Sequence, residues 1–123
     1  KILSCILILM ERIQEYKLGS FIVDGRQFIG SIKIIENKVR YWEKPESQNF
    51  DIKDLQELID KAPEFVLIGT GAAGLLKVPD NAKRIITEKG ISLFTGKTQD
   101  MVKKFNELDK VKKRVNAILC SGS

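Results

Sequence analysis

The stretch PEFVLIGTGAAG, residues 63–74, decides the fold. Pro63 predicts the end of a preceding helix, because proline has no amide hydrogen with which to continue one. Residues 65–68 form a short, continuous apolar run, which is typical of a buried strand. The three glycines that follow predict a tight loop directly after this strand.

Helices and strands alternate on both sides of this stretch. Before it, apolar residues at helical spacing predict a helix that ends at Pro63. After it, helices are expected over residues 79–89 and 98–108, and apolar strands over residues 91–94 and 115–119. Strands joined through helices run parallel, because a parallel connection needs a crossover.

The first half of the chain has the alternation of antiparallel strands instead. Strands are expected over residues 21–23, 27–35 and 39–42, and Asp24-Gly25 is a hairpin turn signal. Gly30 interrupts the inward face of the middle strand, which indicates a bulge or a close backbone approach. The fold class that follows is α/β: a mixed, mostly parallel central sheet with flanking helices, preceded by an antiparallel β-meander that extends or covers it.

Composition excludes several kinds of site. The chain has 123 residues, a formal net charge of +5 and no histidine. Ser-His-Asp and Cys-His catalysis and two-histidine zinc motifs are therefore excluded. Cys5 and Cys120 are the only cysteines, which is too few for a cysteine zinc site within one chain. We expect no metal and no cofactor.

The first residues allow three interpretations. Residues 2–10 form an apolar run that is shorter than the roughly 20 residues needed to cross a bilayer. They are a strand or helix packed on the domain, an extension before a start at Met10, or a targeting segment. We expect residues 1–15 to be an N-terminal extension and residues 16–123 to form one domain, which is cytoplasmic and binds no membrane.

Three motifs have a structural and a functional interpretation. Residues 69–74 match G-x-G-x-x-G, but Pro79 leaves too little room for the helix that a dinucleotide site requires. Gly96-Lys97-Thr98 resembles the end of a P-loop, but Ile91 stands where the first glycine is needed, so Thr98 is interpreted as a helix cap. The basic run at residues 110–114 is interpreted as a solvated turn, and nucleic acid is not an expected partner.

One group of residues predicts a ligand site. In open α/β sheets, ligands bind beyond the carboxyl ends of the parallel strands. If the last strand is parallel to the others, hydroxyls, unbonded backbone N–H groups and one lysine converge there and suit a small anion or a carboxylate. A reactive thiol at the same place is a further possibility. The candidate ligand-binding residues are Gly69, Thr70, Gly71, Lys97, Thr98 and Cys120.

The chain also resembles a known family. The matching features are Gly19-x-Phe21-x-Val23-x-Gly25, Trp42, Asp54-Leu55, Pro63-Glu64, Gly69-Thr70-Gly71, Gly90-Ile91, Thr98, Phe105-Asn106 and Lys113-Arg114-Val115. Over residues 16–120 the chain resembles the Mth-nine-three-eight-like family, also called the adipogenesis-associated Mth domain, which includes a mitochondrial respiratory complex I assembly factor. It implies a compact α/β domain with a mixed sheet and little about chemistry. Family members often carry a histidine where this chain has Cys120.

Two functions follow as hypotheses. The first is a non-enzymatic interaction or assembly module that binds a protein partner or itself, marked by an exposed apolar patch with Tyr41 and Trp42. The second is a site for a small anion or carboxylate at the strand ends, in a binding protein or an enzyme. The sequence as a whole favours the first hypothesis, in which the domain has no enzymatic activity.

Overall fold

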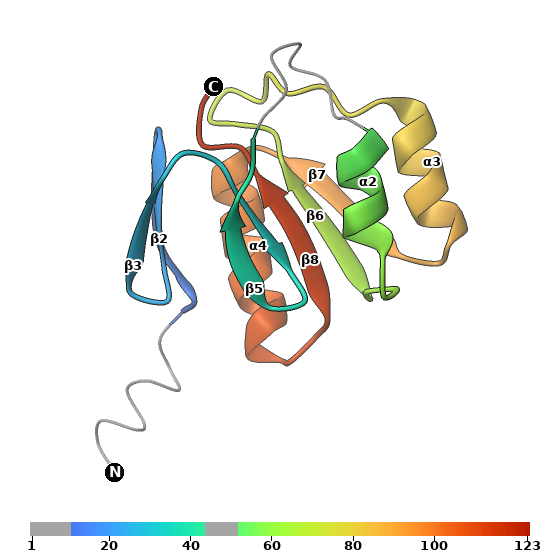
Figure 1. Ribbon diagram of the computed structural model, residues 1–123, viewed down its shortest axis with the longest axis horizontal. Coiled ribbons are helices and arrows are strands. Elements are labelled where there is room, and N and C mark those ends of the chain that lie inside the picture. Colours follow the sequence, from blue (N-terminus) through green and yellow to red (C-terminus); the bar gives the residue numbers. More distant parts are fainter. Residues whose placement is uncertain (1–10, 44–51) are drawn as a thin grey trace.

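The computed structural model describes residues 11–43 and 52–123 (Figure 1). Within these residues the chain forms eight strands and three helices. In chain order they are β1 (Ile13–Lys17), β2 (Ser20–Val23), β3 (Arg26–Ile29), β4 (Ile32–Ile35), β5 (Lys38–Tyr41), α2 (Ile52–Ile59), β6 (Phe65–Gly69), α3 (Asp80–Glu88), β7 (Ser92–Gly96), α4 (Thr98–Lys110) and β8 (Val115–Leu119).

A five-stranded sheet in the order β5-β4-β8-β6-β7 forms the centre of the molecule. β6, β7 and β8 run parallel, so that Gly69 is paired with Gly96 on one side and with Leu119 on the other. β4 runs antiparallel to β8, and β5 runs antiparallel to β4. The predicted α/β class with a mixed sheet is confirmed, and the three parallel strands end at the same edge.

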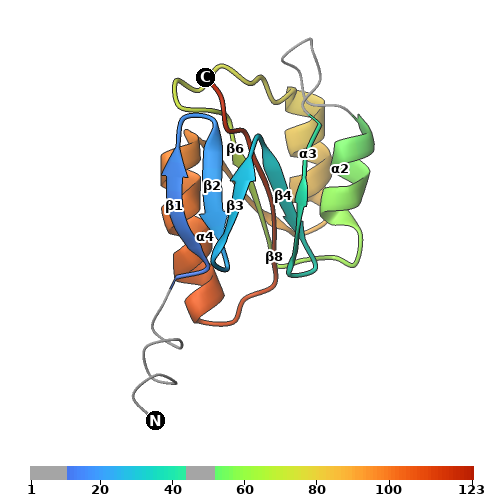
Figure 2. The same cartoon turned by 60° about the vertical axis from the view of Figure 1, so that its left-hand side comes forward.

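The central sheet is covered on both faces. α2 and α3 lie together on one face, whereas α4 and a second sheet, β1-β2-β3, cover the other (Figures 1 and 2). Successive residues of a strand point to opposite faces, so Leu67 belongs to the core beside α4, whereas Val66 and Ile68 belong to the core beside α2 and α3. The burial of both faces explains why β6, and β8 apart from Asn116, are continuous apolar runs.

The meander is divided between the two sheets at Gly30. The strand expected over residues 27–35 is two strands, β3 and β4, which belong to different sheets. Gly30 has a φ of +125°, which side-chain-bearing residues rarely adopt, and this conformation turns the chain from one sheet into the other. The expectation that the meander extends or covers the central sheet is met in both ways: β1–β3 cover it and β4–β5 extend it.

β1 was not expected from the sequence and is fixed by an asparagine of α4. The side-chain amide of Asn106 accepts a hydrogen bond from the Ile13 N–H (3.1 Å) and donates one to the Ile13 carbonyl (2.9 Å). Ile13 itself is buried in the core. The boundary expected between residues 15 and 16 therefore falls inside β1, whereas residues 1–10 lie outside the described part of the chain.

Candidate functional site

The predicted site residues come together at the carboxyl ends of β6, β7 and β8. The side chain of Thr98 joins the strand ends, since its Oγ1 donates to the Cys120 carbonyl (2.7 Å) and accepts from the Gly71 N–H (2.9 Å). The Thr70 hydroxyl donates to the Gly96 carbonyl at 2.9 Å. Of the six candidates, only Lys97 is an exposed side chain, and Thr98 and Cys120 are fully buried.

The polar groups at these strand ends bond to one another. The sequence leads us to expect unbonded N–H groups here, but those of Thr70, Gly71, Thr98 and Cys120 all donate to protein acceptors. The cap predicted at Thr98 is also wrong: Lys97 holds the cap position, and the Thr98 hydroxyl is used between the strands. The arrangement is a closed hydrogen-bonded cluster, which we call the strand-end cluster (residues 69–71, 96–98 and 120).

Close packing explains the glycines of this cluster. A Cβ on Gly69 would lie 2.9 Å from the Thr98 Oγ1 and 3.1 Å from the Thr98 Cα. Gly71 has a φ of +103°, and a Cβ there would lie 2.5 Å from the backbone carbon of Ser123. The G-x-G-x-x-G match therefore has a structural cause, and the next helix begins only at Asp80.

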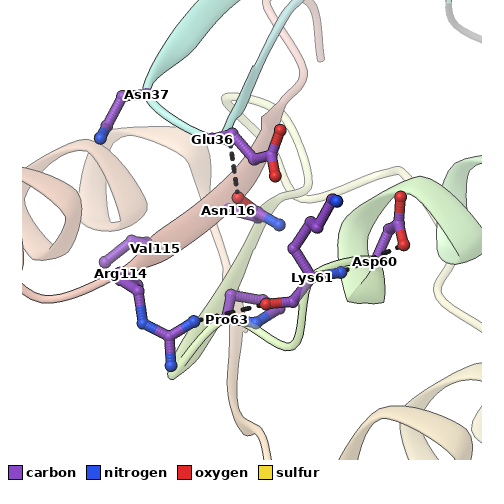
Figure 3. A pocket seen from close by; sticks show the side chains of 8 residues that line it. All are labelled: Glu36, Asn37, Asp60, Lys61, Pro63, Arg114, Val115 and Asn116. Carbon is purple, nitrogen blue, oxygen red and sulfur yellow. Dashed lines mark hydrogen bonds between the residues drawn. The ribbon is translucent and has the colours of Figure 1, made fainter.

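A pocket of about 220 Å³ lies at the opposite edge, where β6 and β8 begin (Figure 3). The Asn116 amide spans it, accepting from the Glu36 N–H (3.1 Å) and donating to the Leu58 carbonyl (2.8 Å). The Arg114 guanidinium donates to the carbonyls of Lys61 and Ala62 just after α2. The pocket is lined by Glu36, Asn37, Asp60, Lys61, Pro63, Arg114, Val115 and Asn116.

These hydrogen bonds indicate that the polar groups of the pocket stabilise the turn that follows α2. Lys61 and Ala62 both have positive φ (63° and 45°), so the chain leaves α2 in a conformation that side chains disfavour. Arg114 and Asn116 satisfy carbonyls of that turn and of the last turn of α2, which would otherwise lack partners. The pocket therefore contains both signs of charge, and its Asn116 amide and Arg114 guanidinium bond to the backbone of the fold.

A third region, formed by the β1–β2 turn, β3 and β5, exposes large apolar side chains. Leu18, Ile29 and Tyr41 are 68%, 74% and 56% exposed. Their backbone positions lie close together, because the N–H of Gly30 donates to the Gly19 carbonyl at 2.9 Å and Gly30 borders the Tyr41 ring. We call these three side chains the apolar patch.

The sequence identified only part of this patch. Tyr41 is exposed as expected, and its ring meets Phe28 edge-on at 5.3 Å. Trp42 is not exposed: it is buried in the core beside α2 and α3, and its Nε1 has no hydrogen-bond partner among the described residues. Ile29 was missed, although an isoleucine at the outward position next to inward Phe28 is the signal that finds it.

Metal and membrane sites were also searched in the described part of the chain. No group of three or more Cys, Asp or Glu side chains there is placed to hold a metal ion. Of the three described helices, none combines the length and apolar character needed to span a bilayer.

Comparisons with known proteins agree with this fold. Residues 13–120 match the model of a family described as a protein of unknown function, DUF498/DUF598. A conserved hypothetical protein of Pyrococcus horikoshii OT3 is similar over 90% of this chain and 98% of its own, with 24% identity and a TM-score of 0.79. An outer membrane protein of Bartonella henselae is 26% identical over 92% of this chain and 96% of its own, with a TM-score of 0.78.

A further solved structure ties the match to the resemblance seen in the sequence. A Mth938-like domain of Bordetella pertussis covers 92% of this chain and 87% of its own, with 20% identity and a TM-score of 0.70. The family match begins at the first residue of β1 and ends just after β8, so it includes every described strand. The chain therefore belongs to the DUF498/DUF598 family, and the resemblance to Mth938-like domains is confirmed.

Proposed function

We propose that this domain is a non-enzymatic interaction or assembly module that binds a protein partner through the apolar patch. The observation that carries the proposal is the exposure of Leu18, Ile29 and Tyr41, whose backbone positions lie around the Gly19–Gly30 contact. Single exposed apolar side chains are ordinary, but a group of them with an aromatic ring is typical of an interface. The strand-end cluster supports the same choice, because its donors and acceptors are already bonded to one another.

Site-specific photo-crosslinking in cells tests the proposal. A photoreactive residue at position 29 is expected to give discrete adducts with a protein partner, or with a second copy of the chain. The control position is Lys89, which is exposed at the end of α3 on the opposite face of the central sheet. Equal adducts from both positions, or adducts that persist when Leu18 and Tyr41 are both changed to Ser, would contradict the proposal.

A small anion or carboxylate site is the second proposal. Lys97 favours it, because it is the exposed member of the strand-end cluster and its ammonium group has no ion-pair partner among the described residues. A thermal-shift screen with phosphate, sulfate and carboxylates tests it. Stabilisation of the wild type that is absent in Lys97→Ala would support a site here, and no shift with any of these anions would remove it.

A further inference from the structure

β5 is the end strand of the central sheet, and one of its two edges is unpaired in the described part of the chain. Among the described strands, its only partner is β4, which lies on one side. An edge strand presents backbone N–H and C=O groups that a further strand can pair with. β5 also carries Tyr41 of the apolar patch, so the interface proposed above continues onto this edge.

The register shows which backbone groups face outward. The N–H of Trp42 donates to the Ser31 carbonyl at 2.9 Å, which makes these residues a hydrogen-bonded pair. Bonded and non-bonded pairs alternate in an antiparallel ladder, so Arg40 and Lys38 bond to β4 in the same way. The N–H and C=O groups of Val39 and Tyr41 consequently point away from β4.

The side chains of β5 divide by face. Val39 packs against the core beside the small sheet, and Tyr41 contacts Phe28 on the same side. Lys38 and Arg40 point to the other side and line a shallow hollow of about 170 Å³ between β5 and α2. Because successive side chains of β5 point to opposite faces, one face of the strand is apolar and the other is basic.

The basic residues lack partners within the described chain. Neither Lys38 nor Arg40 forms an ion pair there, although Glu36, Glu57 and Asp60 line the same hollow. Glu57 is paired with Lys33 at 2.7 Å instead. Lys38 and Arg40 are therefore able to form ion pairs with carboxylates of a chain that lies alongside β5.

The charges of Lys38 and Arg40 also indicate which kind of chain pairs with the free edge of β5. A second copy paired edge to edge through β5 would place Lys38 and Arg40 against the same residues of its partner, and like charges in facing positions are destabilising. Acidic side chains at those positions would instead form cross-strand ion pairs. The net charge of +5 favours the same kind of partner at longer range.

We propose that β5 accepts an extended acidic segment of a partner protein as a sixth strand, with carboxylates facing Lys38 and Arg40 and apolar side chains facing Tyr41. This inference rests on the proposed interaction function and names the chemistry of the partner. The affinity would come from backbone pairing with Val39 and Tyr41, and the specificity from the alternation of acidic and apolar side chains.

A designed hexapeptide of alternating glutamate and valine, acetylated and amidated, tests the proposal. By NMR titration it is expected to bind, and hydrogen exchange at the amides of Val39 and Tyr41 should slow by about tenfold or more, with little change at Lys38 and Arg40. A lysine–valine peptide of the same length is the control. Failure of the acidic peptide to bind, or uniform protection along β5, would overturn the proposal.

Two variants separate backbone pairing from charge. Val39→Pro removes one outward N–H and leaves the bonds to β4 in place, so peptide binding should fall below detection. Lys38→Glu with Arg40→Glu should reverse the preference between the two peptides. If Val39→Pro does not fold, the same loss is expected with a glutamate–valine peptide whose backbone nitrogens on one edge are methylated. Binding that survives this methylation would overturn the proposal.

The outcome is distinguishable from that of the proposed function. Crosslinking from position 29 that persists in the Lys38→Glu, Arg40→Glu variant would leave the interaction function standing and reject strand addition. Loss of adducts in that variant, together with loss in the Leu18→Ser, Tyr41→Ser variant, is the result expected if both proposals hold.

Discussion

The carboxyl ends of the parallel strands and the β3–β5 side of the molecule differ in what they do with their polar groups. At the strand-end cluster, hydroxyls and amides that are suited to a ligand bond to one another across three strands. On the β3–β5 side, apolar side chains are exposed and one strand edge has no partner among the described residues. Residues of a type suited to ligands thus bond to one another within the fold, whereas the β3–β5 side leaves apolar side chains exposed.

Of the variants that test this comparison, Thr98→Val is expected to lower the free energy of unfolding the most. The change keeps the shape of the buried side chain but leaves the Gly71 N–H and the Cys120 carbonyl without the hydroxyl partner. Each unsatisfied buried group costs about 1–3 kcal/mol, so the two together are expected to lower the free energy of unfolding by about 2–6 kcal/mol. Urea denaturation measures it. Thr98→Ser, which keeps the hydroxyl, should cost about 1 kcal/mol, and equal losses in the two variants would show that the hydroxyl bonds matter little.

Gly69→Ala should have the next largest effect. Its Cβ would press on the Thr98 Oγ1 and Cα and on the Leu119 side chain, at 2.9–3.1 Å. Overpacking of this kind costs about 1–3 kcal/mol. Gly96→Ala is the matched control on the neighbouring strand, because its Cβ would meet only the flexible Met101 side chain at 3.4 Å. Thermal denaturation should show a lower melting temperature for the first variant alone.

Tyr16→Phe should have a smaller effect that depends on pH. The Tyr16 hydroxyl donates to the Ser121 carbonyl at 3.2 Å, and its loss should cost about 0.5–1.5 kcal/mol near neutral pH. Burial raises the pKa of the phenol above 10.0, with a further contribution from Cys120. The unfolded state therefore ionises first as pH rises above about 10, and the contribution of Tyr16 to stability is lost from there upward.

Denaturation of the wild type and Tyr16→Phe at about pH 8 and about pH 10.5 measures this difference. The stability gap between the two proteins should narrow at the higher pH. A gap that widens would mean that the folded state, not the unfolded state, favours the ionised phenol.

The smallest effect on stability is expected at the apolar patch. Ile29→Ser removes an exposed side chain, and exposed substitutions stay within about 0.5 kcal/mol. The combined Leu18→Ser, Ile29→Ser variant should have the same melting temperature as the wild type. In sedimentation velocity it should nevertheless lose self-association or partner binding. A large loss of stability would show that the patch belongs to the core and would weaken its assignment as an interface.

The sequence predicted β6 and β8 well because both strands are buried on both faces. β6, β7 and β8 each follow Pro63, Gly90 or a helix, and the helices between them require a parallel arrangement. The division of the meander at Gly30 was not predictable, since alternation continues from β3 into β4 while the chain changes sheets. β1 was missed because its stability depends on Asn106, which lies far away in the chain.

The sequence predicted where the candidate site lies, but not whether its donors and acceptors are already hydrogen-bonded. That residues 69–71, 97–98 and 120 meet follows from three parallel strands ending together. Whether their donors and acceptors are available depends on distances between the loops, such as the 2.7 Å from Thr98 Oγ1 to the Cys120 carbonyl, which sequence patterns do not contain. Whether these residues bind a ligand stays a prediction.

The Asn106 amide has a consequence for strand register. With one acceptor and one donor facing Ile13, it reproduces the pairing that a neighbouring strand would offer to a single residue. A slip of β1 by one residue would turn Gln14 into this position and would send Ile13 out of the core. One side chain on α4 thus favours a single alignment of β1 against the rest of the small sheet.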